Sequence, residues 1–540
     1  MNAAQLLVKS LENEGVTHIY GVPGEENLDF LEALADSTIR FVLVRHEQAG
    51  GFMAATQGRL TGKAGVCFST LGPGATNLMT AAAYAQLGAM PLVMITGQKP
   101  IHSSKQGGFQ ILDVVDMMQP VTQSAERITD AAWIPSQIHN AFATAMQPRP
   151  GAVHLEFPED VAKTTAEGHP FKPFEPSING PTSEAASAIL KRIKSAKAPL
   201  IMVGAGANRQ RICQSLPDFI EHFNIPFFTS QMGKGVVDER HALCLGTAAL
   251  SSNEIAHEAL EHADLVLNIG HDVIEKPPFR MTSDGPEVVH IHHEVATFDP
   301  LYFPQYHLCG DIALSLQALT KQGENVHFEN EAFAPYLKRY QERLTQVVSG
   351  HPVPEATEEH VPLLDLIQGL RQHMPPSGIV ALDNGMYKLW FARYYPAFEP
   401  NTLLLDNALA SMGAGLPSAM GAKITRPEVP VVAVCGDGGF LMNSQSLETA
   451  VRENLDLVVI VLNDKTLGMI RWKQENENKQ DFGLRYNNPD FCALAHSYGA
   501  KGHTVKTTEA FVTHFQQAHE QGGVHVLDVS IDYAKNPDVF

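Results

Sequence analysis

Two apolar, Val-rich runs that each end in an acidic turn constrain this chain more than any other feature. Residues 429–435 and 455–462 have the length and composition of buried parallel strands. Asp437 follows the first run, Asp464 follows the second, and residues 441–454 between them have the pattern of a crossover helix. The two carboxylates would therefore lie at the carboxyl ends of neighbouring strands, where open α/β sheets bind their ligands.

The residues around Asp437 indicate what that ligand is. Gly436, Gly438 and Gly439 flank this carboxylate, so the backbone can approach a phosphate closely, and the following helix aims free N–H groups at it. Gly-Asp-Gly alone is more often only a tight strand-to-helix turn. The second carboxylate, Asp464, favours a site for Mg²⁺ and a diphosphate, because Mg²⁺ binds one or two carboxylates completed by phosphate oxygens and water.

Strand-like and helical runs alternate along the whole chain, which is typical of α/β domains with parallel sheets. We expect three consecutive domains, at residues 1–165, 186–325 and 362–540, with Pro-containing linkers at 169–176 and 351–354. The first two domains carry strand-like runs at 17–22, 39–45, 64–70, 91–97, 151–157, 199–203, 225–228, 264–269 and 287–292.

The first domain places a carboxylate at a strand-to-helix junction. On its own, Glu47 is typical of a first-turn helix residue that the helix dipole stabilises. However, the turns at 21–24, 71–77 and 96–98 also end neighbouring strands. Four turns would then converge on one edge of the sheet, which predicts a pocket containing Glu47.

These segments together resemble the acetolactate synthase group of thiamine-diphosphate enzymes, over the whole chain. The resemblance implies a pyrimidine-binding first domain, a Rossmann-like central domain and a diphosphate-binding third domain, with each site usually shared by two subunits. A homodimer would then be the minimal active unit. Glu47 falls on the glutamate that bonds the pyrimidine N1′ and promotes the imino tautomer, which removes the thiazolium C2 proton.

The resemblance also assigns the remaining cofactor-binding residues. Met412 matches the large apolar residue that keeps the cofactor bent, although it could also be an ordinary core methionine. Asp464 stands where most of the family has Asn, and the backbone carbonyl of Thr466 is implied as the third metal ligand with Asp437 and Asp464. Further cofactor contacts are implied for Pro23, Thr70, Asn77, Asn384, Gly385, Met386, Tyr387, Ala410, Gly436, Gly438, Gly439, Leu467, Gly468 and Met469.

Catalytic roles are implied for Gly24, Phe109 and Gln110 in the first domain, in addition to Glu47. Gln110 could bond the oxygen of the reacting adducts, and Phe109 could exclude water. The first domain lacks the His-His pair with which related decarboxylases protonate the enamine. We therefore expect a carboligase that decarboxylates pyruvate and joins the hydroxyethyl unit to a second 2-oxo acid, forming 2-acetolactate. The alternatives are an oxidase or lyase acting on another 2-oxo acid, or a catalytically silent paralogue.

Two features of the sequence indicate whether the protein binds FAD. Residues 270–279 replace the Arg-Phe-Asp-Asp-Arg-type segment of the FAD-containing enzymes, so we expect thiamine diphosphate and Mg²⁺ but no FAD. The Gly204–Ala207 turn is only half of a dinucleotide fingerprint, and reads as a structural turn.

Charge and composition exclude several other classes. The formal net charge is −20 and there is no basic tract, which argues against nucleic-acid or anionic-membrane partners. The six cysteines lack CxxC spacing, and no apolar stretch reaches the ~20 residues of a membrane helix. The N-terminal segment is unlike a signal peptide, so we expect a cytoplasmic protein.

Overall fold

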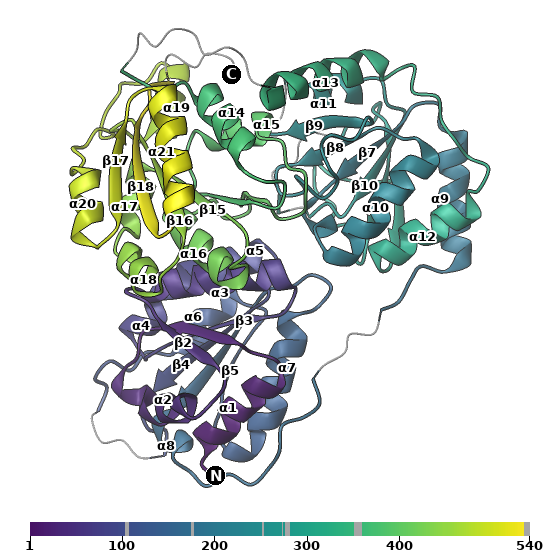
Figure 1. Ribbon diagram of the computed structural model, residues 1–540. Coiled ribbons are helices and arrows are strands. Elements are labelled where there is room, and N and C mark those ends of the chain that lie inside the picture. The colour runs from purple at the N-terminus through teal and green to yellow at the C-terminus, as the bar shows by residue number, and fades with distance from the viewer. Residues whose placement is uncertain are drawn as a thin grey trace.

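Three separate parallel sheets form the protein, as the computed structural model in Figure 1 shows. The structure describes residues 1–102, 107–173, 178–250, 253–272, 274–275, 281–349 and 359–533. Each sheet has six strands and flanking helices, which confirms the predicted α/β class. The exact domain boundaries stay predictions, and the expected linker at 351–354 and part of that at 169–176 lie outside the described residues.

The first sheet has the strand order β2-β1-β3-β4-β6-β5, all parallel. All five strand-like runs predicted in this domain form strands, and β5 is an additional edge strand. The strands are β1 (His18–Gly21), β2 (Arg40–Leu43), β3 (Gly65–Ser69), β4 (Leu92–Gln98), β5 (Ser124–Arg127) and β6 (Ala152–Pro158). The helices are α1 (Ala3–Asn13), α2 (Leu28–Ala35), α3 (Glu47–Thr61), α4 (Pro73–Asn77), α5 (Met79–Leu87), α6 (Val114–Met118), α7 (Ile134–Ala145) and α8 (Glu159–Ala162).

The third sheet, β14-β13-β15-β16-β18-β17, repeats the topology of the first. When strands are numbered within each sheet, both read 2-1-3-4-6-5, so helices α3 and α16 follow equivalent strands. The strands are β13 (Ile379–Leu382), β14 (Leu403–Leu404), β15 (Val431–Gly436), β16 (Leu457–Asn463), β17 (Lys501–Val505) and β18 (Val524–Ser530). The helices are α14 (Leu363–His373), α15 (Lys388–Tyr394), α16 (Gly415–Thr425), α17 (Asp437–Met442), α18 (Ser446–Arg452), α19 (Gly468–Asn476), α20 (Phe491–Ser497) and α21 (Thr508–Gln521).

The central sheet differs in topology. Read from β9, its order β9-β8-β7-β10-β11-β12 is the 3-2-1-4-5-6 order of a Rossmann fold, with the switch point between β7 and β10. The strands are β7 (Pro199–Val203), β8 (Phe227–Ser230), β9 (Cys244–Ala248), β10 (Leu265–Ile269), β11 (Glu287–His292) and β12 (Tyr306–Cys309). The helices are α9 (Ser183–Ser195), α10 (Gln210–Phe223), α11 (Ile255–Leu260), α12 (Ile312–Gln322) and α13 (Ala334–Ser349).

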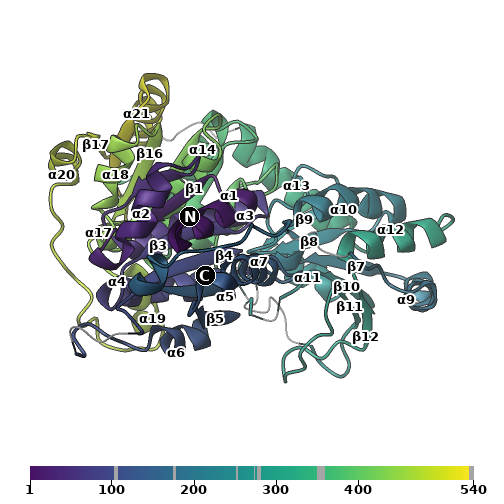
Figure 2. The same cartoon turned by 90° about the horizontal axis from the view of Figure 1, so that it is seen from below.

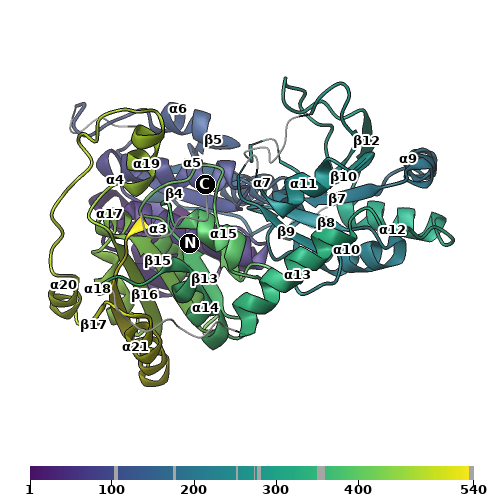
Figure 3. The same cartoon turned by 90° about the horizontal axis from the view of Figure 1, so that it is seen from above.

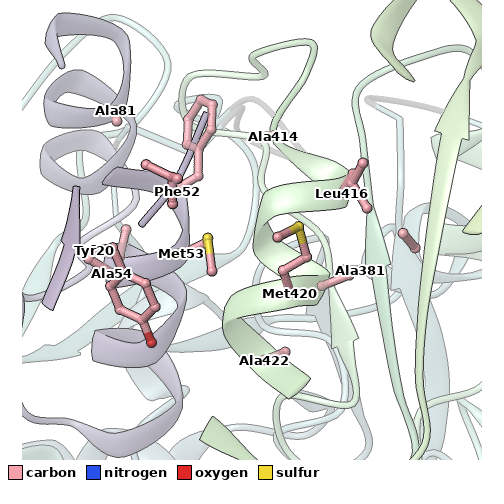
Figure 4. Packing of buried hydrophobic residues seen from close by; sticks show 14 of the residues in the cluster. Tyr20, Phe52, Met53, Ala54, Ala81, Ala381, Ala414, Leu416, Met420 and Ala422 are labelled. Carbon is pink, nitrogen blue, oxygen red and sulfur yellow. The ribbon is translucent and has the colours of Figure 1, made fainter. Parts of the chain in front are cut away.

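The first and third domains pack directly on each other, and the central domain lies to one side of both (Figures 2 and 3). One hydrophobic core spans the two domains. Met53 on α3 faces Met420 on α16 across this contact (Figure 4). The helices can approach closely because Gly421 has no side chain. A Cβ at this position would lie only 2.6 Å from the carbonyl oxygen of Met53.

The crossover between β15 and β16 corrects the prediction of one helix over 441–454. Helix α17 already begins at Asp437, ends at Met442, and is followed by a separate helix α18. The break is at buried Asn443, whose side-chain amide donates to the Gly413 carbonyl (2.7 Å) and to Gln48 Oε1 (3.2 Å). This side chain therefore links the third domain to the start of α3. Among the described residues, no helix is both long and apolar enough to cross a membrane.

Candidate active site

Glu47 is the first residue of α3 and is buried. His46 caps the helix by accepting a hydrogen bond from the Gln48 amide at 3.1 Å. The side chain of Asn77, at the end of α4, donates to Glu47 Oε2 at 2.8 Å. A Cβ on Gly74 would lie 3.3 Å from Glu47 Oε1, so this glycine leaves room beside the carboxylate. Glu47 and the 71–77 turn therefore lie together, as predicted.

The turn after β1 lies on the same edge. A Cβ on Gly24 would lie 2.4 Å from Thr70 Oγ1, so these two residues are in direct contact. Thr70 also donates to Glu26 Oε2 at 2.5 Å, and Glu26 Oε1 accepts from Lys99 Nζ at 2.6 Å. Gly24 and Thr70, both predicted to be site residues, therefore lie together, next to a buried ion pair that the sequence did not reveal.

The Phe109–Gln110 segment also contacts this edge of the sheet. The carbonyl oxygen of Gln110 would lie 2.8 Å from a Cβ on Gly72, in the turn that leads to Asn77. Gln110 has a left-handed backbone (φ 57°), and Phe109 leaves 63% of its surface exposed. The exposed neighbours Ile111 and Leu112 extend this apolar surface.

In the third domain, Asp437 is nearly inaccessible and its carboxylate accepts four hydrogen bonds. Oδ1 accepts from the Gly438 amide (2.7 Å) and the Tyr486 hydroxyl (2.7 Å). Oδ2 accepts from the Lys465 amide (2.8 Å) and the Asn488 side chain (2.7 Å).

Asp464 lies close enough to Asp437 for their charges to repel. Burial and the charge of Asp437 raise the pKa of Asp464 to about 7, and its buried Oδ2 has no hydrogen-bond partner within the described part of the chain. A divalent cation would satisfy this oxygen and offset the repulsion. Nowhere in the described ranges do three or more His, Cys, Asp or Glu side chains gather as a metal site, so the candidate depends on these two carboxylates and a backbone carbonyl.

The residues packed around Asp437 explain why glycines follow it in the turn. A Cβ on Gly439 would lie 2.1 Å from Asp383 Oδ2, and one on Gly438 would lie 3.4 Å from Met412 Cε. The structure therefore brings Met412 onto the Gly-Asp-Gly turn. On the other side, a Cβ on Gly468 would lie 3.0 Å from Asp464 Oδ2, at the start of α19 with Leu467 and Met469.

The loop at 383–387 contacts the Gly-Asp-Gly turn and the segment before Met412. Buried Tyr387 accepts a hydrogen bond from the Gly436 amide at 3.0 Å, and Asn384 donates to the Ser411 carbonyl at 2.8 Å. Ala410 has a left-handed backbone (φ 55°) and donates its amide to Asp406. Gly385 and Met386 complete the loop.

Three further polar residues of the site, Tyr486, Asn488 and Lys388, were not predicted from the sequence. Tyr486 and Asn488 reach Asp437 from a segment about fifty residues away. Lys388 donates to Asn384 Oδ1 (2.6 Å), Asp406 O (3.1 Å) and Asn407 Oδ1 (3.1 Å). Burial lowers the pKa of Lys388 to about 8. Its ammonium joins the 383–388 loop to the segment that leads to Met412.

Three family models match consecutive parts of the chain. They are the N-terminal TPP binding domain (residues 1–117), the central domain (186–319) and the C-terminal TPP binding domain (383–529) of thiamine pyrophosphate enzymes. The chain belongs to the thiamine pyrophosphate enzyme family. The two cofactor-binding domains of this family are those that carry Glu47 and Asp437.

Individual relatives of this family match almost end to end. Acetolactate synthase from Bacillus subtilis (strain 168) is 31% identical over 99% of this chain and 94% of its own length. The catabolic acetolactate synthase of Raoultella terrigena and the isozyme 2 large subunit of Escherichia coli (strain K12) are each 30% identical, over 99% of this chain and 96% of their own lengths.

Proposed function

We propose that this protein is a thiamine-diphosphate-dependent carboligase that decarboxylates pyruvate and joins the two-carbon unit to a second pyruvate, forming 2-acetolactate and CO₂. The observation that carries the proposal is the end-to-end similarity to acetolactate synthases. The Glu47–Asn77 pair at the edge of the first sheet supports it, because it holds a carboxylate beside the glycine turns.

The residues of the chain would have the following roles in this reaction. Thiamine diphosphate, when bound, supplies the nucleophilic carbon and the electron sink. Glu47 would be the group that holds a proton beside the pyrimidine ring, and Asn77 orients the Glu47 carboxyl group through its hydrogen bond to Oε2. Gln110 donates a hydrogen bond to the substrate oxygen, Phe109 excludes water, and Gly24 leaves room for the substrate. Pro23, Thr70, Asn384, Gly385, Met386, Tyr387, Ala410, Met412, Leu467, Gly468 and Met469 would contact the cofactor.

We assign Mg²⁺ to Asp437, Asp464 and the carbonyl of Thr466, with the diphosphate on Gly436, Gly438 and Gly439. All the donors are oxygens, which Mg²⁺ prefers. The partnerless Oδ2 of Asp464 supports the fit.

We further propose a homo-oligomer with the site between two subunits. Apolar side chains are exposed beside both halves of the site, where a second subunit would cover them. Phe109, Ile111 and Leu112 lie beside the first-domain half, and Met442, Ile470 and Phe482 follow the third-domain motifs. The cytoplasmic location stays a prediction.

We propose that the enzyme works without FAD. At the switch point of the central sheet, the Ala205 amide donates to Glu275 Oε2 at 2.9 Å, and the Gly206 amide donates to the Gly270 carbonyl at 2.6 Å. Amides that could bind a dinucleotide phosphate are thus engaged by the chain itself, one of them by the side chain of Glu275. Val273 and residues 276–279 of the replaced segment lie outside the described residues.

Product analysis tests the proposal. The purified protein is incubated with pyruvate, Mg²⁺ and thiamine diphosphate, and the products are identified by NMR. Acetolactate and CO₂ are expected. Acetaldehyde, or acetyl phosphate formed with phosphate and oxygen, as the main product would replace this function with a lyase or an oxidase. No turnover with any 2-oxo acid would indicate a silent paralogue.

A further inference from the structure

The segment Leu484–Asn488 lies against the loop that follows β16 and contacts the candidate metal ligands. The Leu467 amide donates to the Leu484 carbonyl (3.2 Å), the Tyr486 amide donates to the Lys465 carbonyl (3.5 Å), and Thr466 and Arg485 form an isolated antiparallel bridge. This short strip is the only regular pairing that holds the segment among the described residues.

Two side chains of the segment contact different oxygens of Asp437. Asn488 Nδ2 contacts Asp437 Oδ2 at 2.7 Å and Asn463 Oδ1 at 2.9 Å. Tyr486 Oη contacts Asp437 Oδ1 at 2.7 Å and the Thr466 carbonyl at 3.2 Å. Neither side chain carries a formal charge. Both can therefore hold the carboxylate without neutralising the negative charge that would bind a metal.

Each oxygen of Asp437 accepts two hydrogen bonds, and the 484–488 segment supplies one of the two in each case. Oδ2 accepts from the Lys465 amide and from Asn488, which uses both of its lone pairs. Oδ1 accepts from the Tyr486 hydroxyl and from the amide of the adjacent Gly438. Tyr486 therefore contacts both Oδ1 of Asp437 and the carbonyl of Thr466, and both of these residues are proposed metal ligands.

We propose that Tyr486 and Asn488 are positioning residues that orient Asp437 for the metal, so that metal loading and docking of the Leu484–Asn488 segment are coupled. The proposal rests on the metal site proposed above. Partners that orient metal ligands are worth about 10–100-fold in metal affinity. Coupling is reciprocal, so bound metal should in turn stabilise the docked segment.

The test measures metal binding directly. Metal-depleted protein at saturating thiamine diphosphate is titrated with Mg²⁺ by isothermal titration calorimetry. Asn488→Ala and Tyr486→Phe should each weaken Mg²⁺ binding by about 10–100-fold. The KM for pyruvate, measured at saturating Mg²⁺, should stay within about twofold of the wild type, because substrate binding does not involve these contacts.

Matched controls are available nearby. Asn487→Ala changes the exposed neighbour of Asn488, and Tyr498→Phe makes the same change as Tyr486→Phe at the end of α20. Both should bind Mg²⁺ as the wild type does. Hydrogen exchange gives a second readout: Mg²⁺ with thiamine diphosphate should slow exchange of the 484–488 amides in the wild type, and less so in Asn488→Ala.

The proposal fails if Asn488→Ala binds Mg²⁺ as well as Asn487→Ala does, or if Tyr486→Phe binds it more tightly than the wild type. Those results leave the metal site intact and overturn only the positioning role. A wild-type protein that binds no Mg²⁺ in the presence of thiamine diphosphate overturns both.

Discussion

The side chain of Asn77 donates a 2.8 Å hydrogen bond to Oε2 of Glu47, across the gap between α4 and the first turn of α3. The bond fixes one oxygen of a buried carboxyl group and so sets the direction in which the other oxygen, Oε1, points. A carboxyl group fixed in this way is suited to share a proton with a ring nitrogen at a defined place.

Glu47→Gln should lower kcat for acetolactate formation by about 10²–10⁴-fold, the usual contribution of a general acid–base group. The carboxamide keeps the shape of the side chain but cannot exchange the proton. Thiamine diphosphate affinity, measured by calorimetry, should change little.

The control is Glu32→Gln, an exposed glutamate on α2 of the same domain, which should be fully active. A Glu47→Gln enzyme that folds normally and turns over like the wild type would remove Glu47 from the mechanism.

Much of the fold could be predicted because interior parallel strands are continuous apolar runs. β15 and β16 are such runs, and so are β3, β4 and β6 of the first sheet. Five of the strands that could not be predicted lie at sheet edges and have only two to five residues each, so their patterns give little signal. β17, for example, is Lys-Gly-His-Thr-Val, with only Val505 buried. The others are β5, β9, β12 and β14.

Some residues of the candidate site could likewise be predicted from the sequence, and others could not. Asp437, Asp464 and Glu47 each sit in a local pattern of strand, turn and helix, so their position at a sheet edge follows from sequence. Tyr486 and Asn488 have no such pattern, since they lie 49 and 51 residues beyond the carboxylate that they contact. Only the folded chain brings these side chains to Asp437.

Asp464→Asn should retain Mg²⁺ and thiamine diphosphate binding. The carboxamide keeps an oxygen in place of the partnerless Oδ2 and removes a charge that repels Asp437. Asp437→Ala, by contrast, should abolish Mg²⁺-dependent cofactor binding. Calorimetry with both variants checks this pair, and loss of binding in Asp464→Asn would show that the metal needs both charges.

Glu275→Gln should raise the melting temperature at pH 8 and leave it nearly unchanged at pH 5. Burial raises the pKa of Glu275 from 4.5 to about 7, so between these values the folded protein holds a proton that the unfolded chain has released. Stability contributed by this group therefore falls as pH rises from 4.5 to 7, by up to about 3 kcal/mol. Glutamine cannot ionise and avoids the loss.

Thermal unfolding at the two pH values measures this effect, with the exposed Glu261→Gln as the control. Equal shifts at pH 5 and pH 8 would mean that Glu275 is stabilised by its hydrogen bonds in its charged form.

Two inactive variants should restore activity when they share a dimer, if each site combines the first domain of one subunit with the third domain of its partner. Glu47→Gln disables the first-domain half and Asp437→Ala disables the third-domain half. A mixed dimer then has one site with both defects and one with neither. Random pairing after co-expression should give about one quarter of wild-type activity, since half of the dimers are mixed and each has one intact site. If both halves of a site instead came from one chain, every site in the mixed dimer would carry one defect, and activity would not exceed that of the separate variants.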